Sequence, residues 1–210
     1  MSVLEDLNWR YATKEFDNTK ILPQETLDTV YESLRLSASS FGLQPWKFVI
    51  VENKDLREKL LPSSWNQRQV VDASHLIVFC RPTSFGNDDI DRFLKSTAET
   101  RNVEMTTLEG YGNMMKGFVE GKTKSNELNT WMKDQIYIAL GSLLSTCAQL
   151  RIDACPMEGF SAPDYDEILG LTALGLTSAV LCPIGHRAQS DKYATLAKVR
   201  YPLAEVMHKI

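Results

Sequence analysis

The residues best suited to hold a ligand fall in five short segments that lie far apart along the chain. Residues 39–46 (SSFGLQPW) place two hydroxyls, a glycine and an amide between a helical pattern and a strand pattern. The other four are RYATK (10–14), WNQRQ (65–69), PMEGF (156–160) and KVR (198–200). Cations, amides and aromatic rings suit a flat ligand that carries a phosphate. If the segments converge, they could form a phosphate site and the walls of a planar cofactor.

Two pairs of basic residues are the candidates for the phosphate. Arg10 and Lys14 would lie on one face if the first helix continued through them, because they are one turn apart. Lys198 and Arg200 would point to the same side of an extended segment. An arginine can also bind a phosphate through two parallel hydrogen bonds. The alternative for each pair, taken alone, is an ordinary solvated surface.

Several familiar catalytic and binding motifs are absent from the sequence. It contains no GxGxxG after a strand pattern, no GxxxxGK[ST] and no GxSxG, so a Rossmann site, a P-loop and a serine hydrolase are not indicated. Its three histidines, His75, His186 and His208, lack the spacing of metal ligands. We therefore expect no metal site.

The composition fits one ordinary globular domain. The chain has 210 residues, of which 43% are hydrophobic and 24% charged, and its net charge of -4 provides no broad basic field for nucleic acid. There is no signal-peptide pattern and no apolar run near the ~20 residues of a membrane helix. We expect a cytoplasmic protein that binds neither nucleic acid nor membrane. No CxxC pattern occurs, so reduced, buried cysteines are expected; these are Cys80, Cys147, Cys155 and Cys182.

Hydrophobic patterns predict the elements that must position these segments. Ser2 and Glu5 have the spacing of a capping box, and the helix that they begin should end near residues 10–14. Pro23 suits the first turn of a second helix, which leads toward residues 39–46. Asn53 could cap a short helix that ends at Leu61. Three β-rich runs predict core strands at residues 47–51, 74–80 and 178–184.

The sequence allows two roles for each of two longer segments, residues 125–150 and residues 87–124. Residues 125–150 form the longest helical pattern, about 38 Å at 1.5 Å per residue, with apolar positions wide enough to predict burial on nearly all sides. Such a helix could cross into a partner subunit, or it could be the central helix of a monomer. Residues 87–124 are polar and contain loose glycines, which suits a mobile lid. The alternative is a helical excursion on the surface with no substrate role.

Taken in order, these segments resemble the oxygen-insensitive NAD(P)H nitroreductase family over essentially the whole chain. The matching elements are R-x-x-x-K followed by Phe16, the SSxxxQPW segment, WNQRQVVDASHLIVFC, PMEGF and ATLAKVRYP. The resemblance implies an α+β nitroreductase fold, in which helices surround a mainly antiparallel sheet. It also implies a single FMN-binding domain over residues 1–210, with the lid-like excursion at about 87–124, and an intertwined homodimer.

The resemblance further assigns roles to individual residues. Arg10, Lys198 and Arg200 would hold the FMN phosphate, while Lys14 and Asn66 would face the pyrimidine edge. Ser39 and Ser40 would come from the other subunit, and the N–H groups of Glu158 and Gly159 would face N5 and O4. The full set of implied cofactor contacts is Arg10, Tyr11, Ala12, Thr13, Lys14, Ser39, Ser40, Gly42, Asn66, Gln69, Pro156, Met157, Glu158, Gly159, Lys198 and Arg200.

The chemistry implied by the resemblance belongs to the flavin and needs no catalytic acid or base from a side chain. NAD(P)H would reduce the bound FMN and leave, and a nitroaromatic or quinone would take its place. Lys14 would favour the negative charge that develops near N1. Other branches of the fold reduce pteridines, free flavins or enones, or remove halogens, and a non-catalytic flavin-binding or phospholigand-binding module is a further alternative. The sequence does not distinguish NADH from NADPH.

Four positions depart from the pattern of the family. Ala12 stands where a serine is common, and Gln69 stands where relatives often have a lysine, so a hydroxyl and a positive charge are missing. Phe41 and Gly42 replace a smaller polar pair. We predict that Phe41 and Phe118 form part of the wall that faces the substrate.

Overall fold

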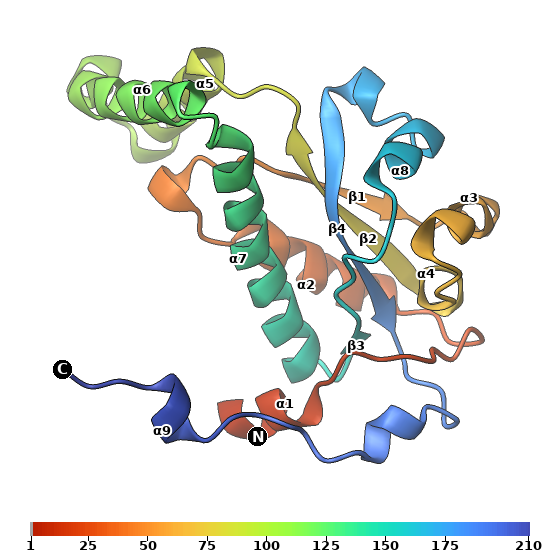
Figure 1. The fold of residues 1–210 in the computed structure, drawn as a ribbon. Helices are drawn as coiled ribbons and strands as arrows, with labels where there is room; N and C mark the ends of the chain where they lie inside the picture. The colour runs from red at the N-terminus through yellow and green to blue at the C-terminus, as the bar shows by residue number, and fades with distance from the viewer. Residues whose placement is uncertain (1) are drawn as a thin grey trace.

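A four-stranded antiparallel sheet lies between two layers of helices (Figure 1). The structure is a computed structural model and describes residues 2–210. The strands, in the spatial order β1-β2-β4-β3, are β1 (Lys47–Val51), β2 (His75–Pro82), β3 (Asp153–Ala154) and β4 (Leu176–Gly185). Every neighbouring pair is antiparallel. The α+β fold class predicted from the sequence is confirmed.

Helices cover both faces of the sheet. On one face lie α2 (Gln24–Arg35) and α7 (Leu128–Gln149). On the other lie α3 (Lys54–Leu60), α4 (Gln69–Asp72) and α8 (Ala162–Ile168). Successive residues of a strand point to opposite faces, so Phe79 packs with α2 and α7 whereas Val78 and Cys80 pack with the second layer. Because both faces are covered, β2 is an almost unbroken apolar run.

A third cluster of buried residues joins the remaining large helices to the N-terminal end of α7. They are α5 (Asn87–Arg101) and α6 (Glu109–Lys124). Leu94 of α5, Met115 of α6 and Trp131 of α7 are all buried in this cluster. Gly112 allows close contact, since a Cβ atom there would lie 2.7 Å from the Leu94 side chain. The predicted excursion therefore consists of two packed helices, and its role as a lid stays a prediction.

Most predicted elements are confirmed, and their sequence signals act as expected. Ser2 and Glu5 form the capping box of α1 (Val3–Trp9), and the side chain of Asn53 accepts a hydrogen bond from Leu56 N–H at the start of α3. The three predicted strands correspond to β1, β2 and β4. Pro23 lies one residue before α2, as its N-cap. The sequence did not reveal β3 or α8, which are two and seven residues long.

The longest helix, α7, is shorter and more exposed than the pattern over residues 125–150 predicted. It begins at Leu128 and ends at Gln149, and within one chain it is not buried on nearly all sides. Lys133 and Asp134 are exposed, and Ile138 retains 45% of its accessible surface. Gly141 faces open space. The pattern misled because apolar and small residues, such as Ile138 and Gly141, also lie on a side of α7 that residues 2–210 leave exposed.

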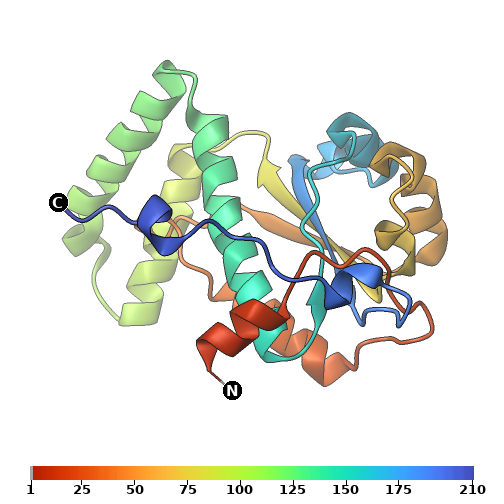
Figure 2. The same ribbon diagram turned by 60° about the horizontal axis from the view of Figure 1, so that its bottom comes forward.

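The C-terminal segment runs outside the sheet and its helical layers. It passes α1 and ends after α9 (Leu203–Val206), as Figure 2 shows. Among residues 2–210, no helix has both the length and the apolar character needed to cross a membrane. All four cysteines are buried and free, as predicted. Burial raises the pKa of the Cys80 and Cys147 thiols to about 12, so both are protonated at neutral pH.

Candidate functional site

A cavity of about 420 Å³ lies between the end of α1 and the C-terminal segment. Four basic residues of the five predicted segments line it: Arg10, Lys14, Lys198 and Arg200. Tyr11, Ala12 and Tyr193 complete much of the remaining wall. The fold therefore brings the two predicted cation pairs, which are nearly the whole chain apart in sequence, to one place.

Arg10 and Lys14 reach the cavity from an extended segment, which corrects the helical arrangement considered above. Helix α1 ends at Trp9, and Arg10 has φ −70° and ψ 143°. Ala12 then forms a bridge with Ala154. Arg10, Ala12 and Lys14, which alternate along this extended chain, line the cavity together with Tyr11, whereas Thr13 is fully buried. The Thr13 hydroxyl donates to Asp153 Oδ1 at 3.4 Å.

Asp191 anchors this segment to the C-terminal part of the chain. Its Oδ2 atom accepts hydrogen bonds from the N–H groups of Lys14 (2.8 Å) and Glu15 (3.1 Å) and from the Tyr11 hydroxyl (2.8 Å). Its Oδ1 atom accepts from Tyr193 N–H at 3.0 Å. Burial alone would raise the pKa of Asp191, but these donors outweigh it and lower the pKa. The carboxylate thus fixes both walls of the cavity.

The cations in the cavity repel one another. Burial, the Arg10 guanidinium and the Arg200 guanidinium together lower the pKa of Lys198 from its ordinary value. The Lys198 ammonium donates to the Arg10 carbonyl oxygen, which holds the two chain segments together. Like charges at close range favour an anion between them. The chemistry of this donor set fits a phosphate group.

The Pro156–Gly159 segment offers two backbone N–H groups to a ligand. Met157 exchanges hydrogen bonds with Leu181 of β4, at 2.9 and 3.0 Å. Because the N–H and C=O of a trans peptide point in opposite directions, the Glu158 N–H points away from β4. Neither Glu158 N–H nor Gly159 N–H has an acceptor within residues 2–210. These two donors are available to a bound molecule.

The WNQRQ segment lies against the same glycine. Gln67 donates from Nε2 to the Gly159 carbonyl oxygen at 2.9 Å, and a Cβ atom on Gly159 would lie 2.8 Å from the Trp65 ring. Trp65 retains 71% of its accessible surface, and both it and Asn66 have left-handed backbone conformations. The exposed Trp65 ring therefore lies beside the two available N–H groups. Gln69 is buried at the start of α4, at 7% exposure.

Predicted cofactor contacts from two segments, residues 10–14 and 156–159, lie along one side of α7. Arg10 and Tyr11 lie beside Leu144 and Cys147, and the Tyr137 hydroxyl bonds Glu158. Tyr137 and Cys147 are ten residues apart, or about 15 Å along the helix axis. Burial raises the pKa of the Cys155 thiol while the Lys14 charge opposes this shift, which places Lys14 near the start of the Pro156–Gly159 segment. An elongated ligand with an anionic end would fit this arrangement.

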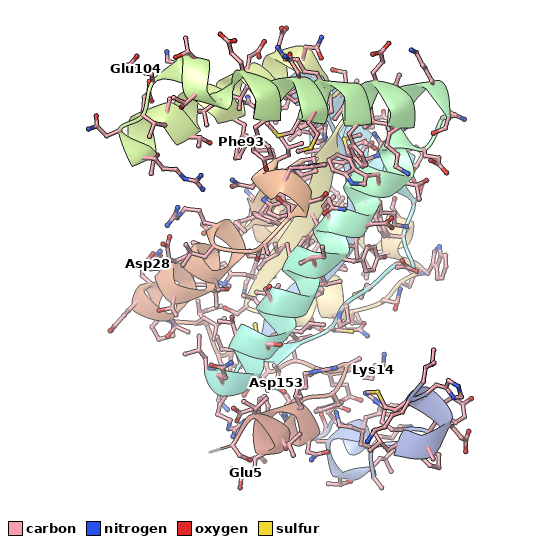
Figure 3. All side chains as sticks on the ribbon, turned by 90° about the vertical axis from the view of Figure 1, so that its left-hand side faces the viewer. Glu5, Lys14, Asp28, Phe93, Glu104 and Asp153 are labelled. Atoms are coloured by element: carbon pink, nitrogen blue, oxygen red, sulfur yellow. The ribbon has the colours of Figure 1, made fainter. Side chains whose placement is uncertain are left out.

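Ser39, Ser40 and Gly42 lie elsewhere in the chain. Ser40 N–H donates to Gln135 Oε1 at 2.8 Å, and residues two apart on a helix, such as Gln135 and Tyr137, face different sides. Figure 1 shows the orange turn of residues 40–42 on one side of α7 and the cyan segment of residues 156–159 on the other. In Figure 3, Lys14 and Phe93, which lies against Gly42, are near opposite ends of α7. One chain does not bring the serines to the cationic cavity.

Phe41 and Phe118 contact each other in this second region. Their ring centroids are 5.1 Å apart, and Phe118 also contacts Trp131 at 5.5 Å. The Tyr111 hydroxyl donates to the Phe41 carbonyl oxygen at 3.2 Å. Phe41 has a φ of 57°, which few residues other than glycine adopt. The two rings form one aromatic surface, and its contact with a substrate stays a prediction.

Sequence reasoning missed Asp191 and Tyr137, and it assigned no individual role to Trp65, although it singled out the segment WNQRQ that contains it. The spacing Asp191–Tyr193 suggests a cap for a short helical turn, but nothing in it indicates residues 11–15 as partners. Tyr137 was hidden within the apolar pattern of α7, because a half-buried tyrosine fits that pattern as well as a leucine does.

Comparisons with known proteins show which family the chain resembles. The model of the Nitroreductase family matches residues 7–186. A Staphylococcus epidermidis protein provisionally named an NAD(P)H nitroreductase is 37% identical over 91% of this chain and 90% of its own. The Aliivibrio fischeri "Major NAD(P)H-flavin oxidoreductase" is 35% identical over 98% of this chain and 97% of its own.

The fold is also shared with a solved structure. A crystal structure from Exiguobacterium sibiricum, provisionally described as a nitroreductase in complex with FMN, has a TM-score of 0.80. The match covers 100% of this chain and 98% of that chain at 18% identity, so it concerns the fold. From the family match and the relatives above 30% identity, the chain belongs to the nitroreductase family.

Proposed function

We propose that the protein is an FMN-dependent NAD(P)H oxidoreductase that reduces nitroaromatics, quinones or both. NAD(P)H and the acceptor would use the same pocket in turn. Arg10, Lys198 and Arg200 converge at one end of a surface. The available N–H groups of Glu158 and Gly159 lie at its other end. This arrangement is the observation that supports the proposal best. The printed names of the relatives, one of which is a flavin oxidoreductase, support it.

The residues present fit FMN. Arg10, Lys198 and Arg200 would hold the phosphate, which carries nearly two negative charges at neutral pH and would relieve the repulsion among these cations. Lys14 and Asn66 would lie at the pyrimidine edge, and the N–H groups of Glu158 and Gly159 would donate to the ring. When bound, FMN supplies the chemistry, since it accepts hydride from NAD(P)H and delivers it to the acceptor. Lys14 would stabilise the negative charge that this reduction creates.

A complete site requires a second copy of the chain. Ser39 and Ser40 lie on the other side of α7 from Glu158, so their contacts with FMN would have to be made in a partner subunit. The exposed stripe of α7 around Ile138 and Gly141 would then be covered in a homodimer. A molecular mass twice that of the chain, measured by light scattering, supports this arrangement, and a stable monomer that binds FMN contradicts it.

Reduction of free flavin is the second candidate function, and the name of the Aliivibrio fischeri relative favours it. Steady-state kinetics separates the two, because a flavin reductase should turn over added FMN faster than it turns over nitroaromatics or quinones. Pteridine and enone reductases are tested by the same comparison of acceptors. A non-catalytic flavin-binding module would fail to reduce its flavin with either nicotinamide.

The proposal is tested by comparing FMN with riboflavin, which has the same ring but no phosphate. Calorimetric titration of the cofactor-free protein should show that FMN binds at least tenfold more tightly, because the charge-assisted contacts of the cationic cavity are lost with riboflavin. Raising the salt concentration should reduce this difference. Equal affinities, or no binding of FMN, would contradict the proposed site.

A further inference from the structure

The side chain of Glu158 is held by two residues of α7. The Tyr137 hydroxyl donates to Glu158 Oε1, and the Lys133 ammonium lies 3.7 Å from the same oxygen. The Lys133 ammonium also lies 5.6 Å from the centre of the Tyr137 ring. Lys133 and Tyr137 are four residues apart, so both project from one face of the helix. The three side chains form one cluster beside the Pro156–Gly159 segment.

The backbone on either side of Glu158 is fixed by other contacts. Met157 is paired with Leu181 of β4, and the Gly159 carbonyl accepts from Gln67. Glu158 lies between these anchors, and its own N–H has no acceptor within residues 2–210. The contact of its side chain with α7 therefore restrains the part of the segment that carries the available N–H groups.

Helix α7 is a rigid support for this restraint. Tyr137 packs against the buried cluster that includes Ile136, Leu140 and Phe79. A hydroxyl that is held by a packed ring has few alternative positions, so it fixes its acceptor well. Lys133 also forms an ion pair with the Glu158 carboxylate. Because its side chain is 46% exposed, its contribution to the restraint is smaller than that of Tyr137.

We propose that Tyr137 and Lys133 are positioning residues, which hold Glu158 so that its N–H and that of Gly159 point toward the ring of the cofactor. This inference rests on the proposed flavin function. N5 of a flavin accepts a hydrogen bond only while the ring is oxidised, because reduction places a hydrogen on that atom. A firmly held N–H group therefore favours the oxidised form, and loosening it should make the flavin easier to reduce.

The test is the reduction potential of the FMN-loaded Tyr137→Phe variant, measured by anaerobic equilibration with a reference dye. We expect a rise that corresponds to a tenfold change in the reduction equilibrium, which is about 30 mV for two electrons. Hydrogen exchange in the cofactor-free protein gives a second readout. The peptide that covers residues 156–160 should exchange at least threefold faster in the variant than in the wild type.

Tyr31→Phe is the matched control. Tyr31 packs against the same buried cluster as Tyr137, but its hydroxyl has no hydrogen-bond partner in the described part of the chain. Removing that hydroxyl should leave both the potential and the exchange of residues 156–160 unchanged. A shift in this control equal to that of Tyr137→Phe would overturn the inference, because any loss of a core hydroxyl would then have the same effect.

A double-mutant cycle tests whether Tyr137 acts through Glu158. If it does, Tyr137→Phe combined with Glu158→Ala should shift the potential no further than Glu158→Ala alone. Additive shifts would contradict the route through Glu158. Should Tyr137→Phe fail to fold, Lys133→Met and Glu158→Ala provide the same test at exposed side chains.

Different results would contradict the proposed function and the positioning role. Wild-type protein that binds no FMN contradicts the proposed function. Wild-type protein that binds and reduces FMN, with potential and exchange unchanged in Tyr137→Phe, contradicts only the positioning role.

Discussion

At the scale of single residues, the cationic cavity depends on two chain segments that approach each other at Arg10 and Lys198. The Lys198 ammonium reaches the Arg10 carbonyl oxygen, while burial and then the charges of the Arg10 and Arg200 guanidinium groups lower the pKa of Lys198. A cluster of like charges is costly unless an anion binds there. The cavity is therefore better suited to ligand binding than to stabilising the fold.

Replacing Arg10 should weaken FMN binding without unfolding the protein. A hydrogen bond to a charged group is worth about 1.5–3 kcal/mol, so Arg10→Ala should raise the dissociation constant about 10- to 100-fold. The backbone carbonyl that Lys198 contacts is retained in this variant. Fluorescence titration measures the effect. Arg92→Ala, at an exposed surface pair with Asp89, is the control and should bind FMN as the wild type does.

The lowered pKa of Lys198 predicts how FMN affinity depends on pH. The phosphate loses its second charge below a pH of about 6, so affinity should fall there. On the alkaline side affinity should fall as Lys198 loses its proton, and this begins at a lower pH than for an ordinary lysine. A Lys198→Arg variant should keep its affinity to higher pH, since a guanidinium stays charged. Superimposable pH profiles for the two proteins would contradict this role of Lys198.

The sequence predicted the four cations that line the cavity but not the residue that orders the segments carrying them. Arg10 and Lys14 were predicted to share a side, and they do, although through an extended chain and not through a helix. A spacing of four residues gives the same side in a helix and in an extended chain. Asp191 could not be predicted, because its partners are 176 to 180 residues away in sequence and no local pattern encodes them.

At the scale of elements, Asp191 joins the segment after α1 to the turn at Lys192–Thr195. Asp191→Asn loses the charge that four donors share, and we expect the free energy of unfolding at pH 7 to fall by about 1.5–3 kcal/mol. The folded-state pKa of Asp191 is lowered, so its stabilisation is present above the unfolded value of 3.8 and is lost as the pH falls through the folded value. Urea unfolding should show a large difference between variant and wild type at pH 7 and a small one near pH 2. A constant difference at both pH values would contradict this assignment.

The aromatic surface between the residue 40–42 turn and α6 should influence the choice of acceptor. Phe41→Ala and Phe118→Ala should each change kcat/KM at least threefold, and unequally for small and large acceptors, because they open the same wall. Phe85→Ala is the matched control, since Phe85 contacts Trp131 in the same buried cluster but does not contact Phe41. Unchanged kinetics in the two variants, or the same changes in Phe85→Ala, would contradict a role of this aromatic surface in the choice of acceptor.

The elements that the sequence predicted are those with long local signals. β1, β2 and β4 are β-rich runs of five to ten residues, and α3 has a clear N-cap. β3 has only two residues and exists because Asp153 and Ala154 pair with β4. Such a strand results from tertiary contact and has no pattern of its own. The exposed stripe of α7 around Ile138 and Gly141 shows another limit of the sequence. An apolar pattern predicts burial, but it does not reveal whether the same chain or a partner subunit covers the helix.

At the scale of the whole molecule, neither composition nor periodicity could have predicted this fold. They indicated one domain with strands separated by helices. The resemblance to nitroreductases implied a mainly antiparallel sheet surrounded by helices. The order β1-β2-β4-β3 was not predicted, because strand pairing depends on contacts between distant residues. The same applies to the site, whose two groups of predicted residues lie on opposite sides of α7 in one chain.

The most direct test of the central claim is the anaerobic absorbance of the purified protein, loaded with FMN, between 300 and 550 nm. The spectrum is recorded before and after NADH or NADPH is added. We predict that bound-flavin bands are present and that at least one nicotinamide bleaches them, since the proposed function requires NAD(P)H to reduce the bound FMN. A protein that remains colourless after incubation with FMN would contradict the cofactor site. Flavin bands that neither nicotinamide bleaches would contradict the proposed oxidoreductase activity.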